Sequence, residues 1–576
     1  MDKSNKVREE ISKNENLKIG IKNEKLITIL LSILLVIFCS CIVHKTFQND
    51  TYYTIKIGES ISNNGIDFKD NFSWHEDLKY TYPHWLYDYA TYIIYSKFGF
   101  TGIYILTCIL SSTLGLILYH TCKKITKTNL ISFIVAFISI SSLIPFITAR
   151  AQLVTFIIFA IEIFCIEMFL KSNKKIYATI LLILPILLAN LHVAVFPFYF
   201  VIYLPYIAEY MIYNNLYNLS ICNKEKKYLQ KKINKINKDI LKSNTNNKIN
   251  KKELIDKKES LQDKLNNLTK NQDMYIESFN KKINNSNKVN ITKNNNIKKL
   301  VVIMILAIFA GFITPIKLAP YTYLLNTMLG NTTSYIAEHL PMVLVNHNSA
   351  FIYLFTVIGI LVLTKCKIRL SDLFMLTGLV ILMLFSSRQL SILILLTPFL
   401  IIRILKSGIE NYSEKGTLKI EKILSRKLCI LSISIVVVIL SIVYMYKIRS
   451  EEYIDKTQYP VYACTYIKEN LDLNKIKIFN EYNYGSYMLF NDIPVFIDSR
   501  AELYAPEFNN YEYDIFTEYM NIQNFKINYK EKFKKYGITH VILNKASQLF
   551  HPINNDYNYT KIYNDDNFYI YEIINK

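Results

Sequence analysis

The sequence lacks the features that mark most soluble proteins. Charged residues make up only 20% of its 576 residues, whereas 51% are hydrophobic. No two of its nine cysteines have the CxxC spacing of a zinc site, and the odd number argues against a disulfide framework. No A-x-A cleavage site follows the first apolar run, so we interpret that run as a retained helix and not as a signal peptide. A secreted soluble enzyme and an ordinary cytosolic enzyme are therefore excluded.

Long apolar runs recur along the chain. A full membrane crossing needs roughly 20 residues, so the shorter runs must extend into polar flanks or form broken helices. The pattern predicts a mainly α-helical, polytopic membrane bundle with about 11 spans. These spans are residues 26–43, 103–119, 130–147, 153–170, 176–189, 193–208, 300–313, 351–364, 373–385, 390–402 and 428–444.

The basic residues predict how the chain is oriented. The net charge is +21, and residues 222–299 hold 21 Lys and 8 acidic residues, which leaves 21 − 8 = +13 there. Alternate loops are basic, and by the positive-inside rule these face the cytoplasm. The predicted location is the cytoplasmic membrane, with the N-terminus inside and the C-terminal segment outside. The excess positive charge then indicates contact with anionic membrane lipid, and nucleic acid is not an expected partner.

Two segments lie outside the predicted spans. In residues 222–299, Leu254, Leu261 and Leu268 recur every seven residues, so an antiparallel helical hairpin or coiled coil is one interpretation. A solvated cytoplasmic insertion is the preferred one. Residues 447–576 alternate helix-like and strand-like runs, which predicts a small extracytoplasmic α/β domain. The predicted parts are a basic tail at 1–25, membrane parts at 26–221 and 300–446, an external loop at 44–102, and these two segments.

Polar side chains collect at one set of span ends. Ionisable groups at such positions are costly and are functional candidates by default. All lie on the predicted external side, where their convergence would suit an anionic, membrane-held substrate. Each also has a structural alternative, namely a solvated acid, an arginine that reaches lipid headgroups, a hydrogen-bonded helix turn, or an aromatic anchor at the membrane surface. The candidates are Asp50, His84, Trp85, Arg150, Asn190, His192, Glu338 and Arg388.

These residues stand in short motifs that resemble those of bacterial GT-C superfamily membrane glycosyltransferases. The resemblance covers about residues 26–545 without the 222–299 insertion. It departs from the family pattern at Ala151, where Pro is usual, at His339, where Trp is usual, and at Asn49, where a second acid would pair with Asp50. The motifs are Asp50-Thr-Tyr-Tyr, Gly58-Glu-Ser-Ile, Pro83-His-Trp-Leu86, Arg150-Ala-Gln-Leu, Asn190-Leu-His192, Ile336-Ala-Glu338-His, Ser387-Arg388 and, in the tail, Phe479-Asn480, Tyr484-Gly485 and Phe496-Ile-Asp498-Ser-Arg500.

The resemblance implies transfer of a sugar from a polyprenyl-phosphate or polyprenyl-diphosphate donor to a cell-envelope acceptor outside the membrane. It implies that Asp50 is the catalytic base. Arg150 and Arg388 would bind the phosphate, since a guanidinium fork suits phosphate oxygens. Glu338 would be a second catalytic-site acid that binds sugar hydroxyls or helps to hold a divalent metal ion.

The remaining candidates have supporting roles in this interpretation. Asn190 and His192 would orient the sugar or the phosphate, and His84 and Trp85 would contact the substrate. Asp498 and Arg500 in the tail either pair with each other or reach the acceptor. Two other functions remain open from the sequence. One is a flippase or transporter of a lipid-linked saccharide, although no repeat relates the two halves. The other is a non-catalytic membrane protein of envelope assembly.

Overall fold

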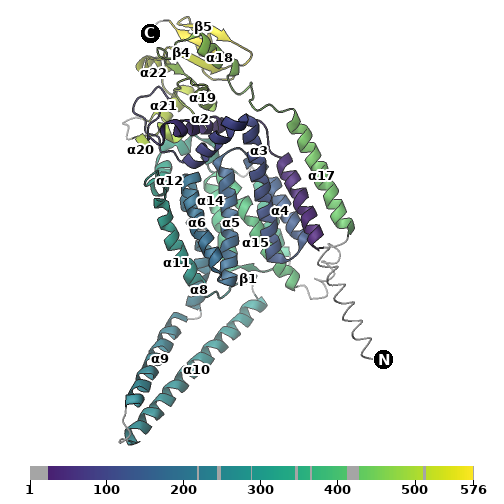
Figure 1. Ribbon diagram of the computed structural model, residues 1–576, viewed down its shortest axis with the longest axis vertical. Coiled ribbons are helices and arrows are strands. Elements are labelled where there is room, and N and C mark those ends of the chain that lie inside the picture. Colours follow the sequence, from purple (N-terminus) through teal and green to yellow (C-terminus); the bar gives the residue numbers. More distant parts are fainter. Residues whose placement is uncertain are drawn as a thin grey trace.

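The computed structural model describes residues 24–216, 219–242, 248–286, 288–343, 348–363, 366–411, 427–509 and 514–574. The described chain is mainly helical, and the predicted basic tail lies almost wholly outside it. Roughly parallel helices form a bundle, with α2 lying across one end of it (Figure 1). The helices before the Lys-rich segment are Glu24–Cys41, α2 Asn49–Asn64, α3 Trp85–Thr126, α4 Asn129–Leu143, α5 Ala151–Ser172, α6 Lys175–Leu191, α7 Phe196–Val201 and α8 Leu204–Leu216.

The second half of the bundle follows the Lys-rich segment. Within the described ranges, seven helices are long and apolar enough to cross a membrane, and three shorter apolar helices accompany them. The chain is therefore built as a membrane protein, while the predicted count of about eleven spans stays a prediction. The later bundle helices are α11 Ile297–Ile308, α12 Ala319–Leu329, α13 Asn348–Leu363, α14 Leu370–Phe385, α15 Leu390–Asn411 and α17 Lys427–Arg449.

The predicted external loop is largely helical. It contains α2 and the first part of α3, which bends at Gly99, where φ is +59°. Only glycine adopts this backbone conformation readily, so Gly99 fixes the bend. At Gly58 a Cβ atom would collide with the backbone oxygen of Asp88, so a residue without a side chain lets α2 and α3 pack in close contact.

The Lys-rich segment forms a hairpin of α9 Leu219–Lys242 and α10 Lys248–Ser286. It projects from the end of the bundle opposite the C-terminal segment (Figure 1). Leu229, Ile233 and Ile236 are buried at helical spacing on α9, which gives that helix an apolar stripe toward α10. The helical hairpin, which the leucine spacing indicated only as the alternative to a solvated insertion, is thus present in the described residues.

The C-terminal segment carries a four-stranded sheet in the order β3-β4-β6-β5. Strands β3 and β4 are parallel, and the other two pairings are antiparallel. The strand-like run at 495–497 joins no ladder, since Val495 makes only an isolated bridge to Ser73, whereas β5 was not predicted. The elements are α18 Val461–Asn470, β3 Ile478–Phe479, α19 Tyr482–Phe490, α20 Pro506–Asn509, α21 Ile515–Gln523, α22 Tyr529–Tyr536, β4 His540–Asn544, α23 Phe550–Asn554, β5 Tyr559–Asn564 and β6 Phe568–Ile573.

Candidate active site

A cavity of about 790 Å³ lies between one end of the bundle and the C-terminal segment. Its predicted lining residues come from helix ends. Asp50 is in the first turn of α2, Arg150 precedes α5, His192 follows α6, and Arg388 precedes α15. The fold therefore brings together polar groups that are up to 450 positions apart, from Asp50 to Arg500. The predicted residues that line the cavity are Asp50, His84, Arg150, His192, Glu338, Arg388 and Arg500.

Two arginines and two carboxylates in this cavity form what we call the open cluster, namely Asp50, Arg150, Glu338 and Arg388. Arg150 contacts the Asp50 carboxylate through Nη2. The same Nη2 lies 3.7 Å from Glu338 Oε1, and Arg388 Nη1 lies 3.9 Å from that oxygen. Arg388 is thus only loosely paired. Of the two guanidiniums, that of Arg388 is therefore more available than that of Arg150 to bind an incoming anion.

The two arginines also lower the pKa of Glu338, the second carboxylate of the open cluster. Burial acts to raise the pKa of Glu338, but Arg388 and then Arg150 outweigh burial and lower that pKa. Burial, with Arg388 next, lowers the pKa of the neighbouring His339 to about 4. At neutral pH the site therefore presents an ionised Glu338 beside a neutral His339.

A second polar unit at the cavity was missed by sequence reasoning. His84 Nδ1 lies 2.7 Å from Asp88 Oδ1, and His84 Nε2 lies 3.1 Å from the Tyr53 hydroxyl. Asp88 is fully buried, whereas Tyr53 and His84 line the cavity. Burial acts to lower the pKa of His84, but the Asp88 carboxylate outweighs it and raises that pKa. The spacing of four residues on one helix was the available signal for this pair.

Two predicted substrate-binding residues hold helix ends instead of lining the cavity. Trp85 Nε1 donates to Asn190 Oδ1 at 3.0 Å. The Asn190 amide nitrogen donates to the carbonyl oxygens of Ile186 and Ile313 at 2.7 and 2.9 Å. These contacts use the Asn190 side chain fully, so its placement favours the hydrogen-bonded helix turn over substrate contact.

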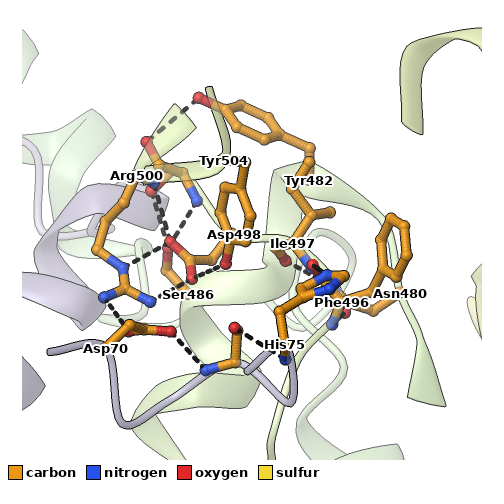
Figure 2. Close-up of polar contacts among 12 residues, drawn as sticks. Asp70, His75, Asn480, Tyr482, Ser486, Phe496, Ile497, Asp498, Arg500 and Tyr504 are labelled. Atoms are coloured by element: carbon orange, nitrogen blue, oxygen red, sulfur yellow. Dashed lines mark hydrogen bonds and ion pairs between the residues drawn. The ribbon is translucent and has the colours of Figure 1, made fainter. Parts of the chain in front are cut away.

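The tail pair Asp498 and Arg500 forms a buried clamp (Figure 2). Arg500 donates to Asp498 through Nε and Nη2 at 2.9 and 2.7 Å, and through Nη1 to Asp70 Oδ1 at 2.7 Å. Tyr504 donates its hydroxyl hydrogen to Asp498 at 2.6 Å. This geometry favours the internal pairing that the sequence left open, and it ties the external loop to the C-terminal segment. The Arg500 guanidinium is therefore not free to bind substrate.

Other residues of the tail motifs are architectural in the same way. The Asn480 side chain accepts from Phe496 N at 2.8 Å and donates to the Ile497 oxygen at 2.7 Å (Figure 2). A Cβ atom on Gly485 would collide with that same Ile497 oxygen. These motif residues fix the chain around Asp498 and so position the C-terminal wall of the cavity.

The residues present do not fit a divalent metal ion. In the described parts of the chain, no three His, Cys, Asp or Glu side chains converge as metal ligands. Such an ion needs several oxygen ligands, yet Arg150 occupies the Asp50 carboxylate, and Asn49 stands where a second acid would be. We therefore derive no step through a metal.

Comparisons with known proteins leave the site to be interpreted from its own chemistry. No family model matches the chain, and no curated protein is similar to it.

The cavity also has lining residues that sequence reasoning did not select, chiefly from the C-terminal segment. Among them are Tyr482, Glu502, Tyr519 and Gln523.

Proposed function

We propose that the protein is an integral membrane glycosyltransferase of GT-C type. It transfers a sugar from a polyprenyl-phosphate or polyprenyl-diphosphate donor to a cell-envelope acceptor on the external face of the cytoplasmic membrane. The N-terminus and the α9–α10 hairpin are cytoplasmic, and the cavity faces outward. This orientation is supported by the basic loops and by the hairpin and C-terminal segment lying at opposite ends of the bundle (Figure 1).

The observation that carries the proposal is the open cluster at the mouth of a membrane bundle. A lipid-linked sugar phosphate needs cations at its phosphate and a carboxylate near its sugar. Arg150 and Arg388 supply two guanidiniums, and Asp50 and Glu338 supply two carboxylates, within one cavity. Its volume of about 790 Å³ lies within the range of about 300–1,000 Å³ that is typical of ligand sites.

The transfer follows from these groups. The acceptor hydroxyl attacks the anomeric carbon, and the bond from that carbon to the phosphate oxygen breaks. The electron pair leaves with the phosphate, whose negative charge Arg388 and Arg150 stabilise. Asp50 takes the hydroxyl proton. For this step Arg150 must shift from Asp50 toward the phosphate, which frees the carboxylate as the negative charge on the leaving group grows.

The proposal is tested by transfer from a panel of labelled polyprenyl-phosphate sugars to extracted envelope fractions. Asp50→Asn should lower turnover by about 10²–10⁴-fold while donor binding persists. Asp77→Asn is the matched control, because Asp77 is an exposed acid of the same loop outside the cavity, and Asn tolerates its φ of +62°. If Asp50→Asn keeps full activity, the base must be another residue. If the wild type transfers sugar from none of the donors, the proposed function is rejected.

One observation favours a second candidate, a flippase or transporter of the lipid-linked saccharide. Glu162 in α5 is fully buried, and neither carboxylate oxygen has a hydrogen-bond partner among the described residues. It lies within electrostatic range of Tyr199 and Tyr203, at the break between α7 and α8. Acids beside broken membrane helices are typical of transporters. Movement of a labelled lipid-linked sugar across proteoliposomes without any transfer would support this candidate.

A further inference from the structure

The cavity has two walls with different chemistry. The bundle contributes the open cluster with its two arginines. The opposite side, which we call the C-terminal wall, has only one cationic side chain, Arg500, and the clamp with Asp70 and Asp498 occupies it. Hydroxyl, amide, carboxyl and aromatic groups make up the rest of that wall. Its members are Glu481, Tyr482, Asn483, Ser499, Arg500, Glu502, Phe508, Phe516, Tyr519, Gln523, Asn524, Ser547 and Gln548.

Two buried polar atoms lack partners, one on this wall and one on α2 next to it. Gln523 Nε2 approaches the Tyr519 hydroxyl without a hydrogen bond of normal geometry. Asn49 Oδ1 has no partner either, although Asn49 Nδ2 donates to the Tyr482 oxygen at 3.0 Å. A buried unsatisfied group costs about 1–3 kcal/mol, so each calls for an explanation. One is a donor and the other an acceptor, and a hydroxyl group satisfies both kinds.

Aromatic rings complete this wall. Tyr482 and Phe516 meet edge to face with ring centroids 5.6 Å apart, and Tyr335 lies 6.3 Å from Phe516. All three line the cavity. A sugar ring has an apolar C–H face and an edge of hydroxyl groups. Rings beside amide and carboxyl groups match both parts of such a ligand.

Glu502 gives the wall its fixed acceptor. It projects from the short helix Ala501–Tyr504 and makes no ion pair with any residue in the described part of the chain. The Tyr323 hydroxyl interacts with it, and Arg388, Asp50 and His84 act on it across the cavity. Burial raises the pKa of Glu502, and Arg388 acts against that rise. A carboxylate placed in this way accepts hydrogen bonds from hydroxyls and repels anions.

We propose that the C-terminal wall is a binding site for a neutral saccharide. This inference rests on the proposed function, because a glycosyltransferase needs a sugar-binding surface opposite its phosphate-binding groups. The saccharide could be the sugar of the lipid-linked donor or a carbohydrate acceptor, and both offer the same hydroxyl chemistry. The described residues of the wall include acids and no uncommitted cation, so the wall itself disfavours anionic saccharides and phosphate-rich polymers. The other cations that line the cavity, Lys79, Arg150 and Arg388, lie outside this wall.

The test measures binding by calorimetry to the full chain in lipid nanodiscs. The probes are neutral tetrasaccharides of several sugars and uronic-acid tetrasaccharides of matched length. We expect at least one neutral tetrasaccharide to bind, and its uronic-acid counterpart to bind about tenfold more weakly or not at all. Gln523→Leu should weaken neutral binding by about tenfold. Asn521→Leu is the matched control, because it removes an amide from the same helix outside the cavity.

The arms of the experiment separate the two sources of the sugar. Displacement of the tetrasaccharide by a polyprenyl-phosphate sugar assigns the wall to the donor, and simultaneous binding assigns it to the acceptor. Equal binding to wild type and to a folded Gln523→Leu variant would overturn the inference, as would binding of uronic-acid probes alone. Saccharide binding without any transfer would reject only the proposed function. Transfer that Gln523→Leu leaves unchanged would reject only the saccharide site.

Discussion

Two clusters, each of two arginines and two carboxylates, lie toward opposite ends of α5. The open cluster is at its N-terminal end. The other, which we call the closed cluster, surrounds Glu167 near its C-terminal end. In the closed cluster Arg403 donates hydrogen bonds to Asp372 through Nε and Nη2 at 2.9 and 2.6 Å. Arg369 lies 2.5 Å from Glu167. Tyr206 adds a hydrogen bond to Glu167 at 2.8 Å.

The two clusters differ in how closely their arginines and carboxylates are paired and in how exposed they are. The side chain of Asp372 is 3% exposed and pairs with both arginines, whereas Glu338 is 41% exposed and lies 3.7 and 3.9 Å from its two arginines. The same residue types therefore serve two purposes. Short paired contacts neutralise the closed cluster and hold helices together. In the open cluster only Arg150 and Asp50 are in close contact, and the longer pairs of Glu338 leave Arg388 able to exchange its partner for a ligand.

The largest expected effect comes from breaking the closed cluster. Asp372→Ala leaves the two buried guanidiniums of Arg369 and Arg403 with one carboxylate between them. Removal of one partner from a buried ion pair costs about 3–5 kcal/mol, a large part of a typical total stability. Thermal unfolding in detergent should show this loss, with a much smaller one for Glu338→Ala. Equal losses for the two variants would contradict the distinction between the clusters.

Arginine-to-lysine changes sharpen the comparison. Arg403→Lys keeps the charge but loses the two-pronged contact with Asp372, so the melting temperature should fall. Arg388→Lys should leave the melting temperature near that of wild type, because the only ion pair of Arg388 in the described chain is 3.9 Å long. Its effect should appear in kcat/KM for the lipid donor, through weaker phosphate binding. Unchanged donor kinetics in Arg388→Lys would remove Arg388 from the phosphate site.

A smaller effect concerns pH and the open cluster. The pKa of Glu338 is lowered in the folded protein, so its stabilising contribution is present above the ordinary carboxylate pKa and is lost as pH falls through the lowered value. Glu338→Gln should be slightly less stable than wild type at neutral pH, and the difference should shrink as the pH falls below the ordinary glutamate pKa of about 4.3. Melting curves across this range measure it. A difference that grows on acidification would show that Glu338 is not held ionised.

The smallest effect is expected at the hairpin. Replacement of residues 228–282 by a Gly/Ser linker should leave folding and transfer activity nearly unchanged, because the hairpin projects away from the cavity (Figure 1). Residues 288–296 must be kept, since Thr292 bonds to Glu209, and Asn294 and Asn296 bond to the Leu170 carbonyl oxygen. Activity of the folded variant is the measurement. Its complete loss would assign the hairpin a role in function.

The sequence by itself determined the features that depend on local pattern. The apolar runs predicted the membrane helices, and the leucine spacing indicated the hairpin as an alternative to a solvated insertion, because hydropathy and helical periodicity are read over neighbouring residues. It also identified polar residues at span ends, since such groups are costly in a membrane wherever the helices pack. Six of the eight span-end candidates line one cavity.

Only the tertiary structure decided which polar groups neutralise one another. Arg500 meets Asp70 across 430 positions, and Arg369 meets Glu167 across 202. No local pattern contains such pairings, so the sequence could not distinguish the clamp from an acceptor contact, and it missed the closed cluster altogether. Strand β5 was missed for a related reason. Three of its six residues are exposed and only Tyr559 is buried, so pairing with β6 makes this segment a strand. Whether a charge is structural or free to act is thus set by the partners that folding supplies.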